Sequence, residues 1–238
     1  MPSRNRKRYV AHIEFGKYSG DSVIVPVCPR SPGVRGRNFE ATVKALAERI
    51  DHVHLLICDT LDRHNLDSDT PELDAKRNGD RWLEENLPVL EKYIQSYDLK
   101  RWDDVRNDPA YKDKLDTLKQ LYLESDDVKT AIDNVASYYL VAKEERCAKK
   151  NEPFEREKEE SRSVGYLIEE FAGTATYNNW YNLPEAYWGI YVSSPDIFNM
   201  LNTVDQTVDL SLPQTIPVKL NRIGASKAGE AAPQKMTA

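Results

Sequence analysis

SVIVPVCPRSPG, residues 22–33, is the stretch of sequence that decides the fold of this 238-residue chain. Residues 22–27 are apolar and rich in β-branched side chains without a polar alternation, which is typical of a strand buried on both faces in a mostly parallel sheet. Pro26 has no backbone N–H, so the regular ladder is expected to end there. Residues 28–37, rich in Pro, Gly and Arg, then predict a turn.

A strand–helix–strand pattern extends outward from this turn. Residues 38–50 predict a helix with Asn38 as its N-cap, and residues 52–58 predict a second buried strand that ends at Asp59. This spacing predicts a right-handed βαβ unit and therefore a doubly wound α/β sheet flanked by helices. Ligands bind beyond the carboxyl ends of the strands in such sheets, so Cys28 and Asp59 are expected at one site.

The rest of the chain predicts mainly helices within a single domain, residues 9–212. The basic residues 1–8 predict a flexible arm. Residues 213–238, rich in Pro, Gly, Ala and Lys, predict a loose C-terminal tail. An edge strand is predicted at residues 9–15, and further helices are predicted at residues 73–97, 109–124, 126–150, 163–175 and 195–201.

The composition excludes several classes of protein. The hydrophobic fraction of 40% allows a sizeable core, and no apolar run approaches the roughly 18 residues that span a bilayer. The start of the chain lacks the apolar stretch of a secretory signal. The three cysteines, Cys28, Cys58 and Cys147, are widely spaced and odd in number, which argues against a disulfide framework or a zinc site. We therefore expect a soluble, cytoplasmic enzyme that does not bind a membrane.

Nucleotide and metal motifs are missing from the sequence. The chain holds no phosphate-binding loop, no Gly-x-Gly-x-x-Gly, no His-Glu-x-x-His and no Ser-His-Asp order. The four histidines lack metal-ligand spacing, so no metal site is predicted. The net charge of -6 argues against a protein that coats nucleic acid, although basic residues cluster locally.

Two groups of residues could carry chemistry. A cysteine or serine where the strand 22–27 ends would face a helix N-terminus, which favours a thiolate or a developing oxyanion. A lone cysteine at a strand end is, however, more often a packing residue. Tyr166 and Glu170 lie four residues apart and share a helix face, where they could hold an ammonium group and shuttle protons. Ordinary packing of the tyrosine over a solvated glutamate is the alternative.

In their order and spacing, these pieces resemble the tRNA-dependent cyclodipeptide synthases. The likeness covers roughly residues 21–201, and its divergence resembles the arginine-containing branch of these enzymes found in fungi. It implies a Rossmann-like domain similar to the catalytic domain of class I aminoacyl-tRNA synthetases, but one that does not use ATP. The motifs are Val27-Cys28-Pro29-Arg30-Ser31, Glu48-Arg49-Ile50-Asp51-His52-Val53, Cys58-Asp59, Asn78-Gly79 with Trp82, Leu83 and Asn86, Arg101-Trp102-Asp103-Asp104, Asp108-Pro109 with Tyr111, Tyr166 with Glu170, and Tyr191 before Ser194-Pro195.

The chain departs from this family at the nucleophile. The family's first apolar strand ends in a nucleophilic serine, followed by Pro and, after one more residue, Asn. In the gap-free register Cys28 takes the place of the serine and Ser31 that of the Asn, whereas a shift of three residues would make Ser31 the nucleophile. A thiol can accept an aminoacyl group as a thioester, and the register favours Cys28. Backbone N–H groups of residues 29–33 would stabilise the oxyanion.

The resemblance also implies roles for other residues. Tyr166 and Glu170 would hold the α-ammonium of the bound aminoacyl group, Glu170 would act as the base, and Tyr191 would assist ring closure. No metal or organic cofactor is needed, because the aminoacyl esters are already activated. If one substrate is arginyl-tRNA, a buried acid must line its pocket, with Asp59 the first candidate and Glu169 the second. Candidates for contacts with the backbone of aminoacyl-tRNA are Lys76, Arg77, Arg81, Lys143, Arg146, Lys149 and Lys150.

Two other interpretations stay open. Another synthetase-like aminoacyl or nucleotidyl transferase would depend on ATP, for which the sequence offers no motif. A non-catalytic Rossmann-like domain that binds tRNA or protein stays open because a cysteine stands at the serine position. The sequence indicates neither which two amino acids are joined nor the oligomeric state.

Overall fold

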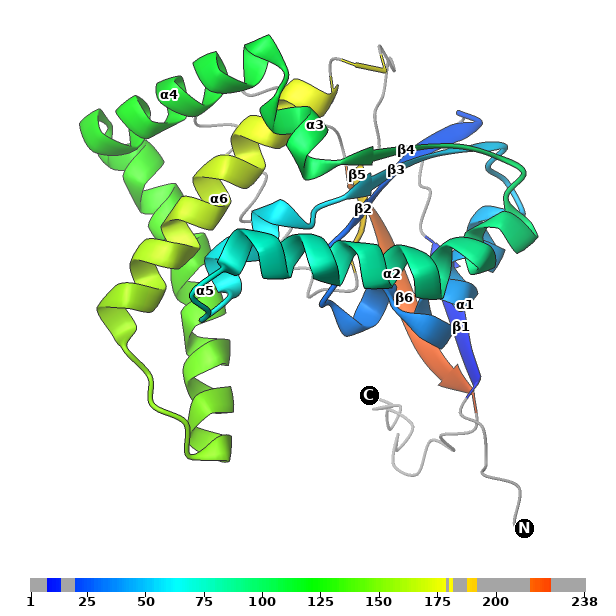
Figure 1. Ribbon diagram of the computed structural model, residues 1–238, viewed down its shortest axis with the longest axis horizontal. Coiled ribbons are helices and arrows are strands. Elements are labelled where there is room, and N and C mark those ends of the chain that lie inside the picture. Colours follow the sequence, from blue (N-terminus) through cyan, green and yellow to red (C-terminus); the bar gives the residue numbers. More distant parts are fainter. Residues whose placement is uncertain (1–7, 14–19, 179, 182–187, 192–214, 224–238) are drawn as a thin grey trace, which may run out of the picture.

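A six-stranded sheet forms the centre of the fold, with helices on both of its faces (Figure 1). The computed structural model describes residues 8–13, 20–178, 180–181, 188–191 and 215–223, and only the backbone of residues 8–9, 188–191 and 215–223. The strands are β1 (Arg8–Ile13), β2 (Ser22–Val27), β3 (His52–Ile57), β4 (Ser96–Arg101), β5 (Trp188–Tyr191) and β6 (Thr215–Ile223). The helices are α1 (Gly36–Leu46), α2 (Pro71–Tyr93), α3 (Trp102–Arg106), α4 (Pro109–Glu124), α5 (Asp126–Lys150) and α6 (Arg156–Asn178), with short 3-10 helices η1 (Pro32–Val34) and η2 (Thr60–Asn65).

The sheet is parallel except at one edge. Its order is β1-β6-β5-β2-β3-β4, and only β1 with β6 is antiparallel. β2 and β3 pair in full register, from Ser22 opposite His52 to Val27 opposite Ile57, so the prediction that the ladder ends at Pro26 is wrong. The predicted fold class, a Rossmann-like parallel sheet flanked by helices, is confirmed. The edge strand predicted at residues 9–15 is present as β1.

The central strand β2 is buried on both faces because its side chains alternate between two apolar cores. Ile24 packs in a cluster with Ile132 of α5 and Phe171 of α6. Val25, on the opposite face, packs in a cluster with Phe39 of α1. Figure 1 shows the same division, with α4, α5 and α6 gathered on one side and α1 and α2 on the other. Two apolar faces explain why the sequence of β2 shows no polar alternation.

Helix α1 begins two residues earlier than predicted, and Asn38 is not its N-cap. The Asn38 side-chain amide donates a hydrogen bond to the Pro32 carbonyl at 3.0 Å. The backbone N–H of Gly36 donates to Oδ1 of Asn86, in α2, at 2.9 Å. Gly36 has a φ of 52°, in the left-handed region that favours glycine. Asn86 of α2 therefore accepts the hydrogen bond of a backbone N–H group in the first turn of α1. The local sequence of α1 does not reveal this contact.

Strand β4 replaces the end of the helix predicted at residues 73–97. Helix α2 ends at Tyr93, and Ser96–Arg101 pairs with β3 in parallel. The helices predicted at residues 109–124 and 126–150 are confirmed as α4 and α5. The helix predicted at residues 163–175 is α6, which is longer because the charged residues from Arg156 onward are helical as well.

The prediction of a loose tail from residue 213 is wrong for the residues that form β6. Thr215–Ile223 pairs with β1 on one side and with β5 on the other. Its partners lie more than 200 residues away in β1, so no local pattern indicates the pairing. The helix predicted at residues 195–201, residues 1–7 of the predicted arm and residues 224–238 of the predicted tail lie outside the described residues.

Among the residues that the structure describes, no helix is both long enough and apolar enough to cross a membrane.

The contact between Gly173 of α6 and Trp102 of α3 gives a test of this packing. A Cβ atom added at Gly173 would lie 2.3 Å from the Trp102 ring. Trp102 is fully buried, so the ring cannot move aside at low cost. We expect Gly173→Ala to lower the free energy of unfolding by about 1–3 kcal/mol, even though alanine favours a helix more than glycine does.

Urea denaturation measures this change, with Gly165→Ala on the same helix as the matched control. A Cβ atom at Gly165 would meet the His64 ring at 3.3 Å, a far milder contact. A Gly173→Ala variant as stable as Gly165→Ala would contradict the packing described for α3 and α6.

Candidate active site

The carboxyl ends of β2 and β3 bring Cys28 and Asp59 to the same edge of the sheet, as the sequence predicts. The Cys58 N–H donates to the Val27 carbonyl at 2.8 Å, which extends the ladder one residue beyond the two strands. The chain then turns at Cys28, whose carbonyl accepts the Ser31 N–H at 2.8 Å. Cys28 is half-buried at this edge.

Three of the predicted catalytic residues meet here. The Cys28 Sγ atom lies 3.6 Å from the Tyr166 hydroxyl, and the Tyr166 hydroxyl donates to Glu170 Oε1 at 3.4 Å. Tyr166 and Glu170 lie one turn apart on α6, and Glu170 is buried. The arrangement forms a path from thiol to phenol to carboxylate along which a proton can move.

Ser31 occupies a different position. It precedes the short helix η1 and makes no side-chain capping bond there. The atom at the strand end that contacts the Tyr166 hydroxyl is the sulfur of Cys28. The remaining predicted catalytic residue, Tyr191, ends β5, and its side chain lies outside the described residues.

Cys58 is a member of the site that the sequence analysis did not single out. It directly follows β3 as Cys28 directly follows β2, and its side chain is buried in the same core as Ile24. A hydrogen bond with Cys28, followed by burial, raises the pKa of the Cys58 thiol well above its usual value. The Cys58 thiol therefore stays neutral. The equal distance of both cysteines from the ends of adjacent strands is the signal that could have revealed it.

Helix α5 borders the same site through Tyr139. Desolvation is the main cause that raises the pKa of the Tyr139 phenol, followed by the charges of Glu170 and Cys28. The cysteine-bearing edge of the sheet is thus covered by residues of α5 and α6.

The Glu169 side chain points away from that of its neighbour Glu170 and forms hydrogen bonds with other residues of the chain. Its carboxylate accepts hydrogen bonds from Arg63 Nη1 at 2.8 Å and from Trp102 Nε1 at 2.8 Å, and it pairs with His64 Nε2 at 2.9 Å. Burial alone would raise the pKa of Glu169, but the hydrogen bonds from His64 and Arg63 hold it down, at about 2. The prediction that Glu169 lines a substrate pocket is not supported, because this carboxylate already has its partners.

The Asp59 carboxylate also has its partners within the chain. It is 1% exposed and forms an ion pair with Arg101, whose Nε donates at 2.7 Å, while the Thr60 N–H donates at 2.9 Å. Gly79 leaves room for this pair, since a Cβ atom there would lie 2.7 Å from Asp59 Oδ2. Asp59 thus already has a guanidinium partner within the chain, and its contact with a substrate guanidinium stays a prediction. The guanidinium beside it belongs to Arg101.

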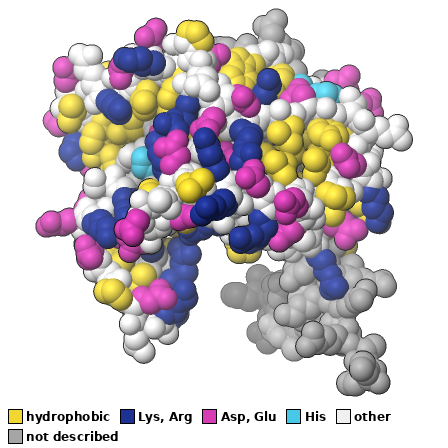
Figure 2. All heavy atoms as spheres, viewed as in Figure 1, with side chains coloured by type: hydrophobic (Ala, Val, Ile, Leu, Met, Phe, Trp, Pro, Cys, Tyr) yellow, Lys and Arg dark blue, Asp and Glu magenta, His cyan; other side chains and the backbone are white. Residues whose placement is uncertain are grey.

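The predicted RNA-binding cations lie on two surfaces. Figure 2 shows a column of Lys and Arg side chains down the lobe that holds the C-terminal end of α5. Several of the candidates form surface ion pairs, which are weak and do not prevent contact with phosphate. The pairs are Lys76 with Asp103, Arg77 with Asp74, Lys143 with Glu159, Lys149 with Glu145 and Lys150 with Glu152, while Arg146 donates to the Ala142 carbonyl and Arg81 is exposed.

One group of three potential metal ligands lies among the described residues, away from Cys28. His52 and His54, in β3, meet Asp98 of β4. The sequence analysis expected no metal site because the four histidines lack metal-ligand spacing. Since β4 was not predicted, Asp98 had no predicted place beside His52 and His54.

Several solved structures that resemble this one are cyclodipeptide synthases. A scan against protein-family models finds no matching family, and a search of curated proteins finds no relative by sequence. A cyclodipeptide synthase from Fluoribacter dumoffii superposes with a TM-score of 0.73 at 16% identity, over 91% of this chain and 100% of the other. A cyclodipeptide synthase from Candidatus Glomeribacter gigasporarum, bound to Phe-tRNAPhe, superposes with a TM-score of 0.60 at 19% identity, over 91% of each chain.

A third structure relates this fold to a wider class. A Mycobacterium tuberculosis protein superposes with a TM-score of 0.56 at 10% identity, over 93% of this chain and 99% of the other. Its structure is described as demonstrating that cyclodipeptide synthetases are related to type I tRNA synthetases. The chain thus has the α/β fold class of these solved structures. Within that class its fold is that of the cyclodipeptide synthases, as the order of its motifs predicts.

The hydrogen bonds to Glu169 predict how stability depends on pH. The pKa of Glu169 is about 2 in the folded protein, below the usual value of 4.5, so its contribution is fully present above about pH 5. That contribution is lost as the pH falls toward 2. We expect Glu169→Gln to cost about 2–4 kcal/mol of unfolding free energy at pH 7 and to flatten the decline in stability at acid pH.

Urea denaturation at pH 7, 5, 4 and 3 measures both effects. Glu157→Gln is the matched control, since Glu157 is exposed near the start of α6. The same acid decline in Glu169→Gln as in the unmodified protein would show that Glu169 is not the responsible group.

Proposed function

We propose that this protein is a cyclodipeptide synthase, an ATP-independent aminoacyltransferase that joins the aminoacyl groups of two aminoacyl-tRNAs into a diketopiperazine. The observation that carries the proposal is the contact of Cys28 with Tyr166, and of Tyr166 with Glu170, at the sheet edge of a cyclodipeptide synthase fold. The described relatives that bear this fold are cyclodipeptide synthases, and one of them is bound to an aminoacyl-tRNA.

The first step transfers an aminoacyl group to Cys28. The sulfur attacks the ester carbonyl, the ester C–O bond breaks, and the ribose hydroxyl of the tRNA leaves with a proton. The Cys28 thiol loses its proton toward Tyr166, which is already hydrogen-bonded to Glu170. The product is a thioester on Cys28.

The turn after Cys28 limits which N–H groups can stabilise the oxyanion. Within residues 29–33, Pro29 and Pro32 have no N–H, and the Ser31 N–H is bonded to the Cys28 carbonyl. The backbone N–H groups of Arg30 and Gly33 are the remaining donors in this turn. We assign the oxyanion contacts to these two.

The later steps use the amine of the bound aminoacyl group. Tyr166 and Glu170 would hold its α-ammonium, and Glu170 would accept its proton when the amine attacks the ester of a second aminoacyl-tRNA. The new terminal amine then attacks the thioester, which closes the six-membered ring and returns the thiol of Cys28. Tyr191 remains the candidate for the proton movements of ring closure.

The two amino acids that are joined are a separate question from the type of reaction. An arginine-containing product is supported by the family resemblance alone, since Asp59 and Glu169 are both paired within the chain. Arginyl-tRNA as one substrate, and a cytoplasmic location, therefore stay predictions.

Product analysis separates this function from the alternatives. Incubation with a mixture of aminoacyl-tRNAs, without ATP, should yield a cyclic dipeptide that mass spectrometry detects. A product that appears only with ATP would support a synthetase-like transferase. No cyclic dipeptide from any pair of charged tRNAs, together with measurable tRNA binding, would support the non-catalytic alternative.

The nucleophile is tested by trapping the aminoacyl-enzyme with radiolabelled aminoacyl-tRNA. We expect Cys28→Ala to lower the rate of acylation by at least roughly 10³-fold, because the attacking atom is removed. Ser31→Ala, the matched control three residues away, should retain the label. Neutral hydroxylamine should release the label from the unmodified protein as from a thioester, but not from Cys28→Ser. Label retained on Cys28→Ala would contradict the assignment and favour Ser31.

The basic end of α5 is tested by the salt dependence of tRNA binding. Lys149→Glu with Lys150→Glu should weaken binding more at low salt than at high salt. The slope of log K against log salt should fall by about 1–2, since each lysine that binds a phosphate releases roughly one counterion. Lys112→Glu, an exposed ion-paired lysine on α4, is the control. A slope equal to that of the unmodified protein would exclude Lys149 and Lys150 from the interface.

A further inference from the structure

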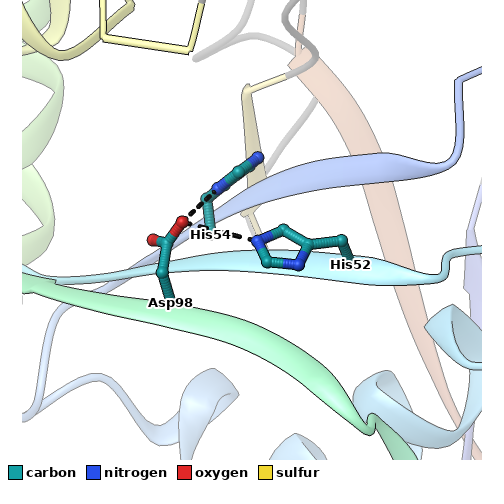
Figure 3. A group of neighbouring side chains, drawn as sticks. All are labelled: His52, His54 and Asp98. Atoms are coloured by element: carbon teal, nitrogen blue, oxygen red, sulfur yellow. Dashed lines mark hydrogen bonds and ion pairs between the residues drawn. The ribbon is translucent and has the colours of Figure 1, made fainter.

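The pairing of β3 with β4 brings together three side chains that suit a metal ion. His52 and His54 are two residues apart on β3, so both side chains lie on the same face of the sheet. Asp98 of β4 is the register partner of His54. Asp98 Oδ2 lies 2.7 Å from His54 Nδ1 and 3.4 Å from His52 Nε2 (Figure 3). One ligand atom from each of the three residues lies within 4.8 Å of the others.

Neighbouring hydroxyl groups hold these ligand atoms in place. The Ser96 hydroxyl lies 2.7 Å from His52 Nδ1 and can accept its proton, which leaves the lone pair on Nε2 facing Asp98. The Tyr181 hydroxyl donates to Asp98 Oδ1 at 3.0 Å, so Oδ2 faces the histidines. The Tyr181 ring also packs on the His54 ring, with centroids 3.8 Å apart. Second partners of this kind orient the ligands in protein metal sites.

We propose that His52, His54 and Asp98 form a binding site for a divalent transition metal ion of the Zn²⁺ type. Imidazole nitrogens and a carboxylate oxygen are ordinary Zn²⁺ ligands, at about 2.0–2.2 Å from the ion. Such bond lengths place tetrahedral ligand atoms about 3.3 Å apart, close to the separation of His52 and Asp98. The ion would displace the proton shared by His54 and Asp98, and those two atoms would separate by about 0.6 Å. Water would complete the coordination.

The exposure of the side chains agrees with binding. The His52 and Asp98 side chains are 32% and 38% exposed, so an ion can enter from solvent.

We expect the bound ion to have a structural role, because the site lies away from the proposed nucleophile. His54 lies four residues before Cys58 on the same strand, or roughly 13 Å along it. The ion would join β3 to β4 and stabilise the folded state by binding it selectively. Removal of the metal should therefore lower thermal stability without removing the nucleophile of the proposed reaction, and the inference does not depend on that reaction.

The test is a titration of the full chain, freed of metal with a chelator, with ZnCl₂ and separately with CoCl₂. We expect one Zn²⁺ per chain by calorimetry, a rise in melting temperature, and visible absorption from bound Co²⁺. Asp98→Asn keeps the shape of the side chain, and His52→Gln changes a partly exposed residue, so both variants should fold. Each should weaken binding by at least about 10-fold.

Two control variants make the test decisive. His12→Gln removes an exposed histidine of β1 and should leave the affinity unchanged. Cys28→Ala should also leave it unchanged, which tests whether the ion binds at the thiols instead. No stoichiometric binding, or binding that survives Asp98→Asn and His52→Gln but is lost in Cys28→Ala, would overturn the proposal. If no stoichiometric binding is found, the three side chains form only a hydrogen-bonded group.

Discussion

The parallel pairing of β2 with β3 is the constraint on which the two apolar cores and the candidate active site depend. Register partners on parallel strands point to the same face, so this pairing sends Ile24 and Leu56 toward α5 and α6. It carries Cys28 and Cys58 past the strand ends onto that same face, next to Tyr166 of α6. A slip of one residue along β2 would turn Cys28 toward α1 and α2 and would remove it from Tyr166.

Buried ion pairs hold the helices that complete the site. Arg101, at the end of β4, neutralises Asp59 at the end of β3, and Arg63 of η2 neutralises Glu169 of α6. Removal of one partner from such a pair leaves an uncompensated buried charge, which costs about 3–5 kcal/mol. Glu169 anchors α6 to η2 and α3, and its neighbour Glu170 points instead toward Tyr166. Adjacent acids on one helix thus have separate tasks, one structural and one proposed as catalytic.

The two ends of β3 have different chemistry for a physical reason. The end near Cys58 meets a turn and the half-buried Cys28, so a substrate can reach it from beyond the strands. The end at His52 lies beside β4, whose residues are more exposed than those of β3, and polar side chains are tolerated there. The proposed nucleophile Cys28 lies beside one end of β3 and the proposed metal site lies at the other end, so the two can coexist because several strand residues separate them.

Local sequence was enough to predict the α/β class, the strand Ser22–Val27, the helices α4 and α5, and the shared helix face of Tyr166 and Glu170. Each of these depends on contacts between residues close in the chain. The order of the motifs also indicated the family whose fold the chain has. Only the tertiary structure decided the cap of α1 by Asn86, the strands β4 and β6, and the partners of Asp59 and Glu169. It also placed Cys58 beside Cys28 and Asp98 beside His54. All of these are contacts between residues far apart in sequence, and such contacts leave no local pattern because their energy comes from burial and pairing in the folded chain.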